Sequence, residues 1–115
     1  RPIYEQVTEK FRIYIYQGVL PPGERLPSVR QMAMELSINP NTIQRAYMTL
    51  EQEGLIYPVK GKGNFVADTS SIQKKSRQDY CREFQGLVRK GRKLGISEKT
   101  LTDLVKKEFE EEKND

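Results

Sequence analysis

The sequence predicts a mainly α-helical protein with one small β-hairpin, and two observations support this fold class. Five stretches of the chain carry apolar residues at helical spacing. Between the third and the fourth stretch the period changes, and two short strand-like runs flank a glycine-rich tip. Cys81 is the only cysteine, so no intramolecular disulfide supports the 115-residue chain, which is expected to form one compact domain with a small appendage.

The first helix is predicted over residues 2–17, and Gly18 ends it. Its apolar residues repeat every four positions and comprise Ile3, Val7, Phe11 and Ile15. We expect this helix to pack under the two helices that follow and to complete a three-helix core.

The next segment, 19–28, contains three prolines and a glycine, which exclude regular structure there. Leu20 and Leu26 are expected to enter the core from this loop. Arg25 fits two roles, a solvated loop residue or a contact to phosphate, and the solvated role is favoured.

Two short helical patterns then face each other across a tight turn at 37–39. Ser28 is the predicted N-cap of the first pattern, with Gln31 three residues later as a capping box requires. Asn39 is the predicted N-cap of the second, with Pro40 at the first helical position, where a missing N–H is no loss. The two apolar faces comprise Met32, Ala33 and Leu36 in the first helix and Ile43, Ala46, Tyr47 and Leu50 in the second.

Pro40, Asn41, Gln44 and Arg45 lie at the start of the second helix of this pair, off its buried stripe. A helix-turn-helix carries its base-reading side chains at this place. Asn and Gln can form two hydrogen bonds with an adenine edge, and Arg can do the same with guanine. The pattern therefore predicts a helix-turn-helix, although a generic helical hairpin with a polar outer face fits it equally well.

Two strand-like runs, 55–59 and 64–66, form a predicted hairpin with a basic, glycine-rich tip. A hairpin directly after a recognition helix is the wing of a winged helix. Lys60 and Lys62 are then expected to reach phosphates, while Gly61 lets the backbone approach closely. The alternative is a surface hairpin whose lysines only keep an edge strand from associating. The position next to the helix pair favours the wing.

Four sequence blocks occur in this order: L-P-P-G-E-R-L-P-S-V-R, I-N-P-N-T-I-Q-R-A-Y, L-E-Q-E-G-L-I and G-K-G-N-F-V. Together they resemble the DNA-binding domain of the GntR family of bacterial transcription regulators over about residues 2–67. The N-P-N-T block and the short remainder after the wing are similar to the YtrA-like subfamily in particular. About 48 residues follow the wing, too few for the effector-binding domain of the larger subfamilies.

The resemblance implies roles for residues at matching positions. Arg30 corresponds to a family residue that contacts the operator. Many relatives have Arg where Pro40 stands, and Pro40 cannot donate to a base or a phosphate, so recognition must rely on its neighbours. The recognition-helix matches are Asn39, Asn41, Thr42 and Gln44, and the wing-tip match is Gly61. With Arg45, Lys60 and Lys62, which the pattern itself indicates, these residues form the predicted DNA-binding site.

Two more helices are predicted after the wing, over about 71–95 and from Ser97 onward. The apolar face of the first comprises Tyr80, Phe84, Leu87, Gly91 and Leu94, and that of the second comprises Leu101, Leu104, Val105 and Phe109. Two short amphipathic helices cannot bury both stripes on each other alone. A partner surface is therefore expected.

The simplest partner is the same pair of helices from a second subunit, which predicts a homodimer. Its shared core is predicted to contain Tyr80, Phe84, Leu87, Leu104 and Phe109. The resemblance agrees, because YtrA-like regulators have a short helical dimerisation tail. In the alternative, the tail folds back onto the winged helix of a monomer. Cys81 is expected to fill apolar space rather than to act in redox chemistry.

Charge is distributed unevenly along the chain. Residues 1–68 carry 8 Lys+Arg and 7 Asp+Glu. Residues 69–95 carry 8 Lys+Arg and 2 Asp+Glu, so this segment is basic, whereas residues 96–115 carry 4 Lys+Arg and 7 Asp+Glu and are acidic. The net charge of +4 permits an anionic partner without demanding one. His is absent, and with one cysteine this removes most metal-ligand sets and the usual nucleophile pairs. No enzyme activity, metal site or cofactor is therefore predicted.

No apolar run approaches transmembrane length and no signal peptide is visible, so we expect a cytoplasmic protein without membrane contact. Residues 1–68 are predicted to form the winged helix-turn-helix domain, and residues 69–115 the helical dimerisation tail. The function indicated is a sequence-specific transcription regulator, a dimeric repressor that binds a palindromic DNA operator through the helix 40–53 and the wing 55–66. The resemblance adds a transporter operon as the target, and the sequence identifies no small-molecule effector. The alternative function is a winged-helix module that binds a protein instead of specific DNA.

Overall fold

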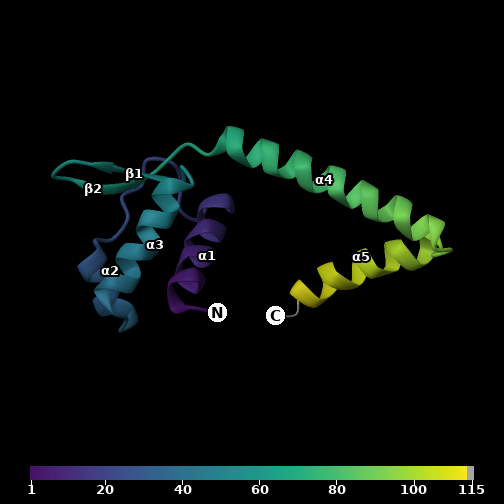
Figure 1. Ribbon diagram of the computed structural model, residues 1–115, viewed down its shortest axis with the longest axis horizontal. Coiled ribbons are helices and arrows are strands. Elements are labelled where there is room, and N and C mark those ends of the chain that lie inside the picture. The colour runs from purple at the N-terminus through teal and green to yellow at the C-terminus, as the bar shows by residue number, and fades with distance from the viewer. Residues whose placement is uncertain (114–115) are drawn as a thin grey trace. The chain divides into compact units, whose positions relative to one another are not determined.

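The computed structural model describes residues 1–113, and Figure 1 shows their five helices and one β-hairpin. In chain order the elements are α1 (Ile3–Tyr16), α2 (Val29–Leu36), α3 (Pro40–Gln52), β1 (Ile56–Val59), β2 (Gly63–Val66), α4 (Ser70–Lys93) and α5 (Glu98–Lys113). The predicted fold class, mainly helical with one small β-hairpin, is confirmed. None of the described helices is long and apolar enough to cross a membrane.

The chain divides into two compact units, Arg1–Gln73 and Lys74–Asp115. The first unit contains α1, α2, α3, the hairpin and the first residues of α4, and the second contains the rest of α4 with α5. Among the described residues, the cluster of buried apolar side chains lies within the first unit. The first unit therefore has a hydrophobic core of its own.

The core of the first unit combines residues from three helices, the hairpin and the segment before α2. It comprises Val7, Phe11, Ile15, Leu26, Ala33, Ile43, Ala46, Tyr47, Leu50, Leu55, Ile56 and Val66. Leu20 packs against this cluster, as predicted together with Leu26. The predicted core-facing positions are wrong at Ile3 and Leu36, which are 55% and 46% exposed. These residues lie in the first turn of α1 and the last turn of α2, where they line a surface groove instead.

The turn between α2 and α3 is built by the predicted caps. The Ser28 hydroxyl accepts a hydrogen bond from the N–H of Gln31 at 3.0 Å, whereas the Gln31 side chain bonds within α2, which leaves the capping box half formed. Ser37 adopts φ 54°, the left-handed conformation that ends α2. Asn39 then caps α3 by accepting from the N–H of Asn41 at 2.8 Å. These local bonds determine where α3 begins.

Aromatic and charged pairs hold α1 along α3. The ring of Phe11 meets that of Tyr47 edge-on, with 5.5 Å between the centroids. Near the end of α3, the Arg12 guanidinium donates two hydrogen bonds, at 2.7 and 3.1 Å, to the carboxylate of Glu53. The Tyr47 hydroxyl donates to the Pro27 carbonyl at 2.8 Å. The segment before α2 is thereby tied to the same interface.

The hairpin pairs β1 and β2 in antiparallel register, with Ile56 opposite Val66. Both of these residues are buried and join the hairpin to the core. At the tip, the N–H of Lys62 donates to the Val59 carbonyl at 2.9 Å, and Gly61 adopts φ +78°. A side chain at Gly61 would strain this turn, so the glycine is required by the backbone.

Part of the proline-rich segment pairs with the two-stranded hairpin through an isolated β-bridge. The N–H of Leu26 donates to the Asn64 carbonyl at 2.8 Å, and Arg25 lies opposite Phe65 in an antiparallel bridge. The prediction that 19–28 lacks regular structure is therefore wrong at this bridge. The prolines of the segment lie on either side of the bridge and leave its N–H groups free to pair.

In the second unit, α4 and α5 form a helical hairpin. Ser97 caps α5 as predicted, accepting from the N–H of Thr100 at 3.1 Å, and Gly95 turns the chain with φ +82°. Gly91 is buried, and a Cβ placed there would meet the Leu101 side chain at 3.5 Å. This is an ordinary van der Waals distance, so Gly91 marks the place near the turn where Leu101 of α5 packs against α4.

Burial raises the pKa of Tyr47 to about 12, and the charge of Glu35 adds to the shift. Because the folded pKa lies above the unfolded value of about 10, this hydroxyl contributes stability that is complete below about pH 10 and is lost as the pH rises toward 12.

Tyr47→Phe should cost about 1 kcal/mol near neutral pH, since the Pro27 carbonyl loses its donor. It should also lose less stability than the wild type between about pH 8 and about pH 11, as measured by urea unfolding. An identical alkaline loss in both proteins would contradict this assignment.

Candidate nucleic-acid interface

The outer face of α3 carries most of the predicted reading residues. The buried stripe of α3 turns the opposite side of the helix toward solvent. Asn41, Gln44 and Arg45 are exposed, and Thr42 is half-buried. Pro40 occupies the first helical position and offers no N–H there. The fold thus exposes three hydrogen-bonding side chains within little more than one helical turn.

Two of the predicted contact residues are already engaged within the protein. The side-chain oxygen of Asn39 is the acceptor that caps α3, so this residue fixes the start of that helix. The guanidinium of Arg45 lies over the ring of Tyr4 in α1, with Cζ 3.7 Å from the ring centroid. The sequence did not reveal this role of Tyr4, because the spacing of apolar residues in α1 does not show which side chain of α3 lies against Tyr4.

The wing tip is exposed and cationic. Lys60, Gly61 and Lys62 all lie in the turn between β1 and β2. Arg30 is exposed in the first turn of α2, just after the Ser28 cap. Flexible cations such as these suit phosphate oxygens, whereas amides suit base edges. The structure therefore places both kinds of group on the first unit.

Arg25 also belongs to the wing. It lies opposite Phe65, which lies opposite Tyr57, so the three side chains share one face of the small sheet. The two rings stack with 5.9 Å between centroids. The Arg25 guanidinium reaches Gly63, where a Cβ would meet its Nε at 3.3 Å. No local pattern signals this placement, because the bridge joins segments far apart in the sequence.

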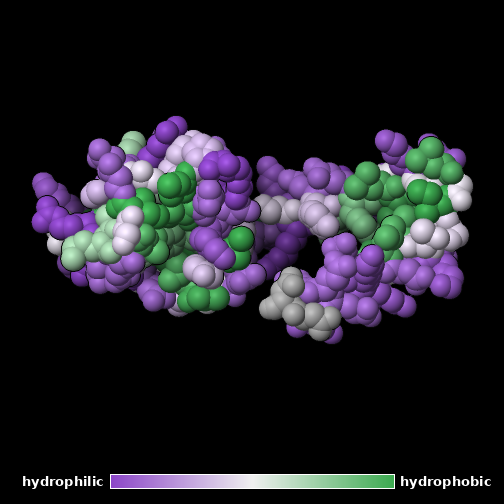
Figure 2. All heavy atoms as spheres, turned by 90° about the horizontal axis from the view of Figure 1, so that it is seen from below, coloured by the Kyte–Doolittle hydropathy of each residue, from purple (hydrophilic) through white to green (hydrophobic). Residues whose placement is uncertain are grey.

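The residues predicted for dimerisation are exposed in the single chain: Tyr80, Phe84, Leu87, Leu104 and Phe109. Figure 2 shows apolar side chains, in green, gathered over the α4–α5 hairpin at the right of the view. The rings of Tyr80 and Phe84 stack with 6.5 Å between centroids. The hairpin therefore presents an apolar surface to solvent.

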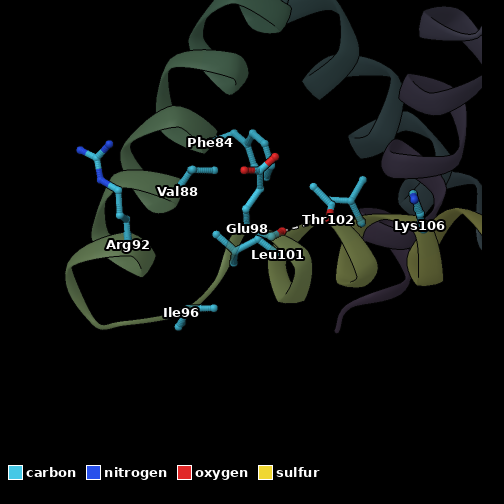
Figure 3. Close-up of a pocket in the computed structure, with 9 residues that line it drawn as sticks. Phe84, Val88, Arg92, Ile96, Glu98, Leu101, Thr102 and Lys106 are labelled. Atoms are coloured by element: carbon cyan, nitrogen blue, oxygen red, sulfur yellow. Dashed lines mark hydrogen bonds between the residues drawn. The ribbon is translucent and has the colours of Figure 1, made fainter.

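An apolar groove of about 590 Å³ runs between α4 and α5. Phe84 and Val88 line it from α4 and Leu101 from α5, as Figure 3 shows. Ile96 and Val105 complete its apolar lining. Sequence reasoning did not predict the groove, because it exists only once the turn at 94–97 brings the two helices together.

The first unit matches a known family. The family described as "Bacterial regulatory proteins, gntR family" matches residues 3–66, from the start of α1 to the end of β2. This chain belongs to the GntR family. The resemblance seen in the four sequence blocks is thus confirmed, and the GntR winged helix-turn-helix is the fold of its first unit.

Two relatives of this GntR chain come from Bacillus subtilis (strain 168). The uncharacterized HTH-type transcriptional regulator YhcF is 34% identical over 107 residues, which are 92% of this chain and 88% of YhcF. The HTH-type transcriptional repressor YtrA is 39% identical over 69 residues, which are 60% of this chain and 53% of YtrA. The likeness to YhcF therefore extends through the tail.

Solved structures agree with this assignment. A GntR family transcriptional regulator from Listeria monocytogenes has a TM-score of 0.72 and 34% identity, covering 93% of this chain and 95% of that chain. The AraR(DBD) in complex with operator ORR3 has a TM-score of 0.55 and 35% identity, covering 57% of this chain and 80% of that chain. As a GntR member, the chain is a DNA-binding transcriptional regulator and not an enzyme.

The wing tip generates a prediction about salt dependence. Replacing both Lys60 and Lys62 with Ala should weaken binding to all duplexes to a similar extent, because phosphate contacts carry no base information. The slope of log affinity against log salt should fall by about 0.9 for each phosphate that the two lysines no longer neutralise. Fluorescence anisotropy at several salt concentrations measures both quantities. The control is Lys107→Ala with Lys113→Ala, which removes the same charge from α5. An unchanged slope in the wing variant would show that Lys60 and Lys62 touch no phosphate.

Proposed function

We propose that this chain is a dimeric transcriptional repressor that binds a palindromic operator, with one copy of α3 in the major groove of each half-site. The observation that carries the proposal is the exposed polar face of α3 in the same compact unit as a cationic wing. A two-fold dimer presents two copies of this surface related by its axis, so the matching DNA site is a palindrome. Because an operator lies on the chromosome, we place the protein in the bacterial cytoplasm.

The side chains are proposed to fall into two groups by their chemistry, those that contact bases and those that contact phosphates. Asn41 and Gln44 are proposed to read base edges through their amides, with Thr42 at the side of the same surface. Arg45 is proposed to reach either a guanine or a flanking phosphate from the same helix. The proposed phosphate contacts, which set the register on the duplex, are Arg25, Arg30, Lys60 and Lys62, with Gly61 allowing close approach.

Two parts of the proposal, that the protein represses transcription and that it acts on a transporter operon, rest on its relatives. YtrA is named a transcriptional repressor, and this chain is 39% identical to it over 69 residues, which supports repression. The proposal of a transporter operon rests on the resemblance to YtrA-like regulators alone.

The tail supports dimerisation through its unburied side chains. Leu87 and Phe109 are each 64% exposed in the single chain. Fully burying an apolar side chain of this size contributes about 1.5–3 kcal/mol, so a surface that covers several of them would be strongly favoured. A second copy of the α4–α5 hairpin offers a surface of the same apolar chemistry. We therefore propose that two tails share one core.

Selection of bound sequences from a random pool of duplex DNA tests the proposal directly. The full chain should enrich a palindromic sequence whose half-sites lie about 10 base pairs, or a multiple of this spacing, apart. Sedimentation of the protein with the enriched duplex should give two chains for each duplex. Enrichment of no sequence would overturn the proposed function and favour a winged helix that binds a protein.

Gln44 should determine part of the base preference. Gln44→Ala should relax the preference at one or two positions of each half-site, because an amide paired with adenine contributes about 1–3 kcal/mol of discrimination. The matched control is Gln52→Ala, which removes the same amide from the other end of α3. Repeating the selection with both variants measures the effect. A Gln44→Ala profile identical to that of the wild type would show that another residue reads the DNA.

Phe84 should be essential for assembly. Phe84→Asp should convert the dimer to a monomer, because the new carboxylate would be buried without a partner in the shared core. The first unit should stay folded, since its core lies at residues 7–66. Operator affinity should then fall sharply, because each half-site is bound without its tethered neighbour. Sedimentation velocity and DNA titration measure these two effects.

Two further variants make the test of the tail specific. Leu87→Asp should also give a monomer, and it changes none of the residues that line the groove between α4 and α5. Gln78→Asp adds the same charge to an exposed polar position of α4 and should remain dimeric. A Phe84→Asp protein that stays fully dimeric would contradict the proposal that two tails share one core, and it would point to an interface on the winged helix.

A further inference from the structure

The contact between α1 and the recognition helix at Tyr4 and Arg45 has a consequence for DNA recognition. The Arg45 guanidinium carbon lies 3.7 Å from the centroid of the Tyr4 ring, a close cation–π distance. We propose that Tyr4 is a positioning residue whose ring holds the Arg45 guanidinium ready for DNA. The inference rests on the DNA-binding role of α3 proposed above.

Arg45 points outward from α3 but has a long side chain that needs a support. It lies two positions after the buried Ile43, and thus about 200° around the helix from it. A solvated arginine at such a place samples many rotamers, and ordering it costs free energy when DNA binds. The ring of Tyr4 removes much of this freedom before binding.

The backbone carbonyls of Tyr4 and Arg45 each accept a hydrogen bond from a threonine one turn later in the same helix. Thr8 is buried, and its hydroxyl donates to the Tyr4 carbonyl at 2.7 Å. The Thr49 hydroxyl donates to the Arg45 carbonyl at 3.0 Å. Between the helices, the Phe11–Tyr47 ring contact lies in the core of the same α1–α3 interface and sets how α1 packs on α3. The position of the guanidinium is therefore set by the fold.

An aromatic ring is a suitable support because it leaves the arginine both charged and able to donate. A guanidinium that rests on a ring face keeps N–H donors at its edge, where they can reach a base or a phosphate. A carboxylate in the place of the ring would neutralise the cation, occupy its donors and repel the DNA backbone. Tyr4 thus restricts the movement of Arg45 without using its charge.

A double-mutant cycle on DNA affinity tests the inference. The probe is the duplex that the wild-type chain enriches from a random pool. Tyr4→Leu should weaken binding about two- to tenfold, the cost of ordering one flexible side chain. Tyr4→Phe keeps the ring and should stay within about twofold of the wild type. In an Arg45→Ala background, Tyr4→Leu should have no further effect, because the side chain that it positions is gone.

Each other outcome of the cycle overturns the inference. Unchanged or tighter binding by Tyr4→Leu would show that Arg45 needs no support or must leave the ring to reach DNA. An equal loss in the Arg45→Ala background would show that Tyr4 contacts DNA itself or acts only through folding. Circular dichroism of every variant checks that the helices remain.

A measurement without DNA separates this inference from the proposed function. Nitrogen-15 relaxation of the Arg45 Nε–H should show more motion in Tyr4→Leu than in the wild type or Tyr4→Phe. Equal motion in all three proteins would overturn the positioning role even where the chain selects an operator. Failure of the wild type to enrich any sequence would instead overturn the proposed DNA binding, and with it the role of the Tyr4–Arg45 contact in that binding.

Discussion

Burial of one face of α3 is the interaction on which the whole DNA-binding unit depends. Tyr47 shows this most directly, because its ring meets Phe11 of α1 while its hydroxyl bonds to Pro27 in the segment that leads to α2. One side chain thus joins three parts of the chain. These contacts fix the rotation of α3 about its own axis. A rotation by one residue, about 100°, would bring Gln44 toward the core, so the exposure of the proposed reading residues is a consequence of core packing.

The same interface explains how the supports of the reading surface are distributed. The Asn39 cap determines where α3 begins, and the Arg12–Glu53 pair ties the far end of α3 to α1. The wing is anchored by the buried Ile56 and Val66, which belong to the same core. The proposed base-reading groups therefore stand on rigid elements, as precise recognition requires. The flexible cations lie at the wing tip, and the phosphate contacts proposed for them tolerate more movement.

The two units differ in how they bury apolar surface. The first has a core drawn from three helices and a hairpin, whereas the described part of the second is one helical hairpin that leaves Leu87 and Phe109 largely exposed. Leu101 of α5 packs against α4 at Gly91 near the turn, but two helices cannot cover both faces of each other. A tail of this kind gains most of its stability from a partner surface. The proposed dimer, and the symmetric DNA binding proposed with it, would both meet this one physical deficit.

Sequence patterns alone determined most of the local structure of this protein. The caps Ser28, Asn39 and Ser97, the buried stripe of α3 and the exposed Gln44 were all predictable, because each depends on residues within a few positions of one another. Tertiary packing decided the rest. The Tyr4–Arg45 contact, the bridge between Arg25 and Phe65, the groove in the tail and the exposure of Ile3 and Leu36 had no local signal. Each depends on residues in separate elements, and such contacts are set by how the folded elements pack against each other and not by the spacing of residues along one of them.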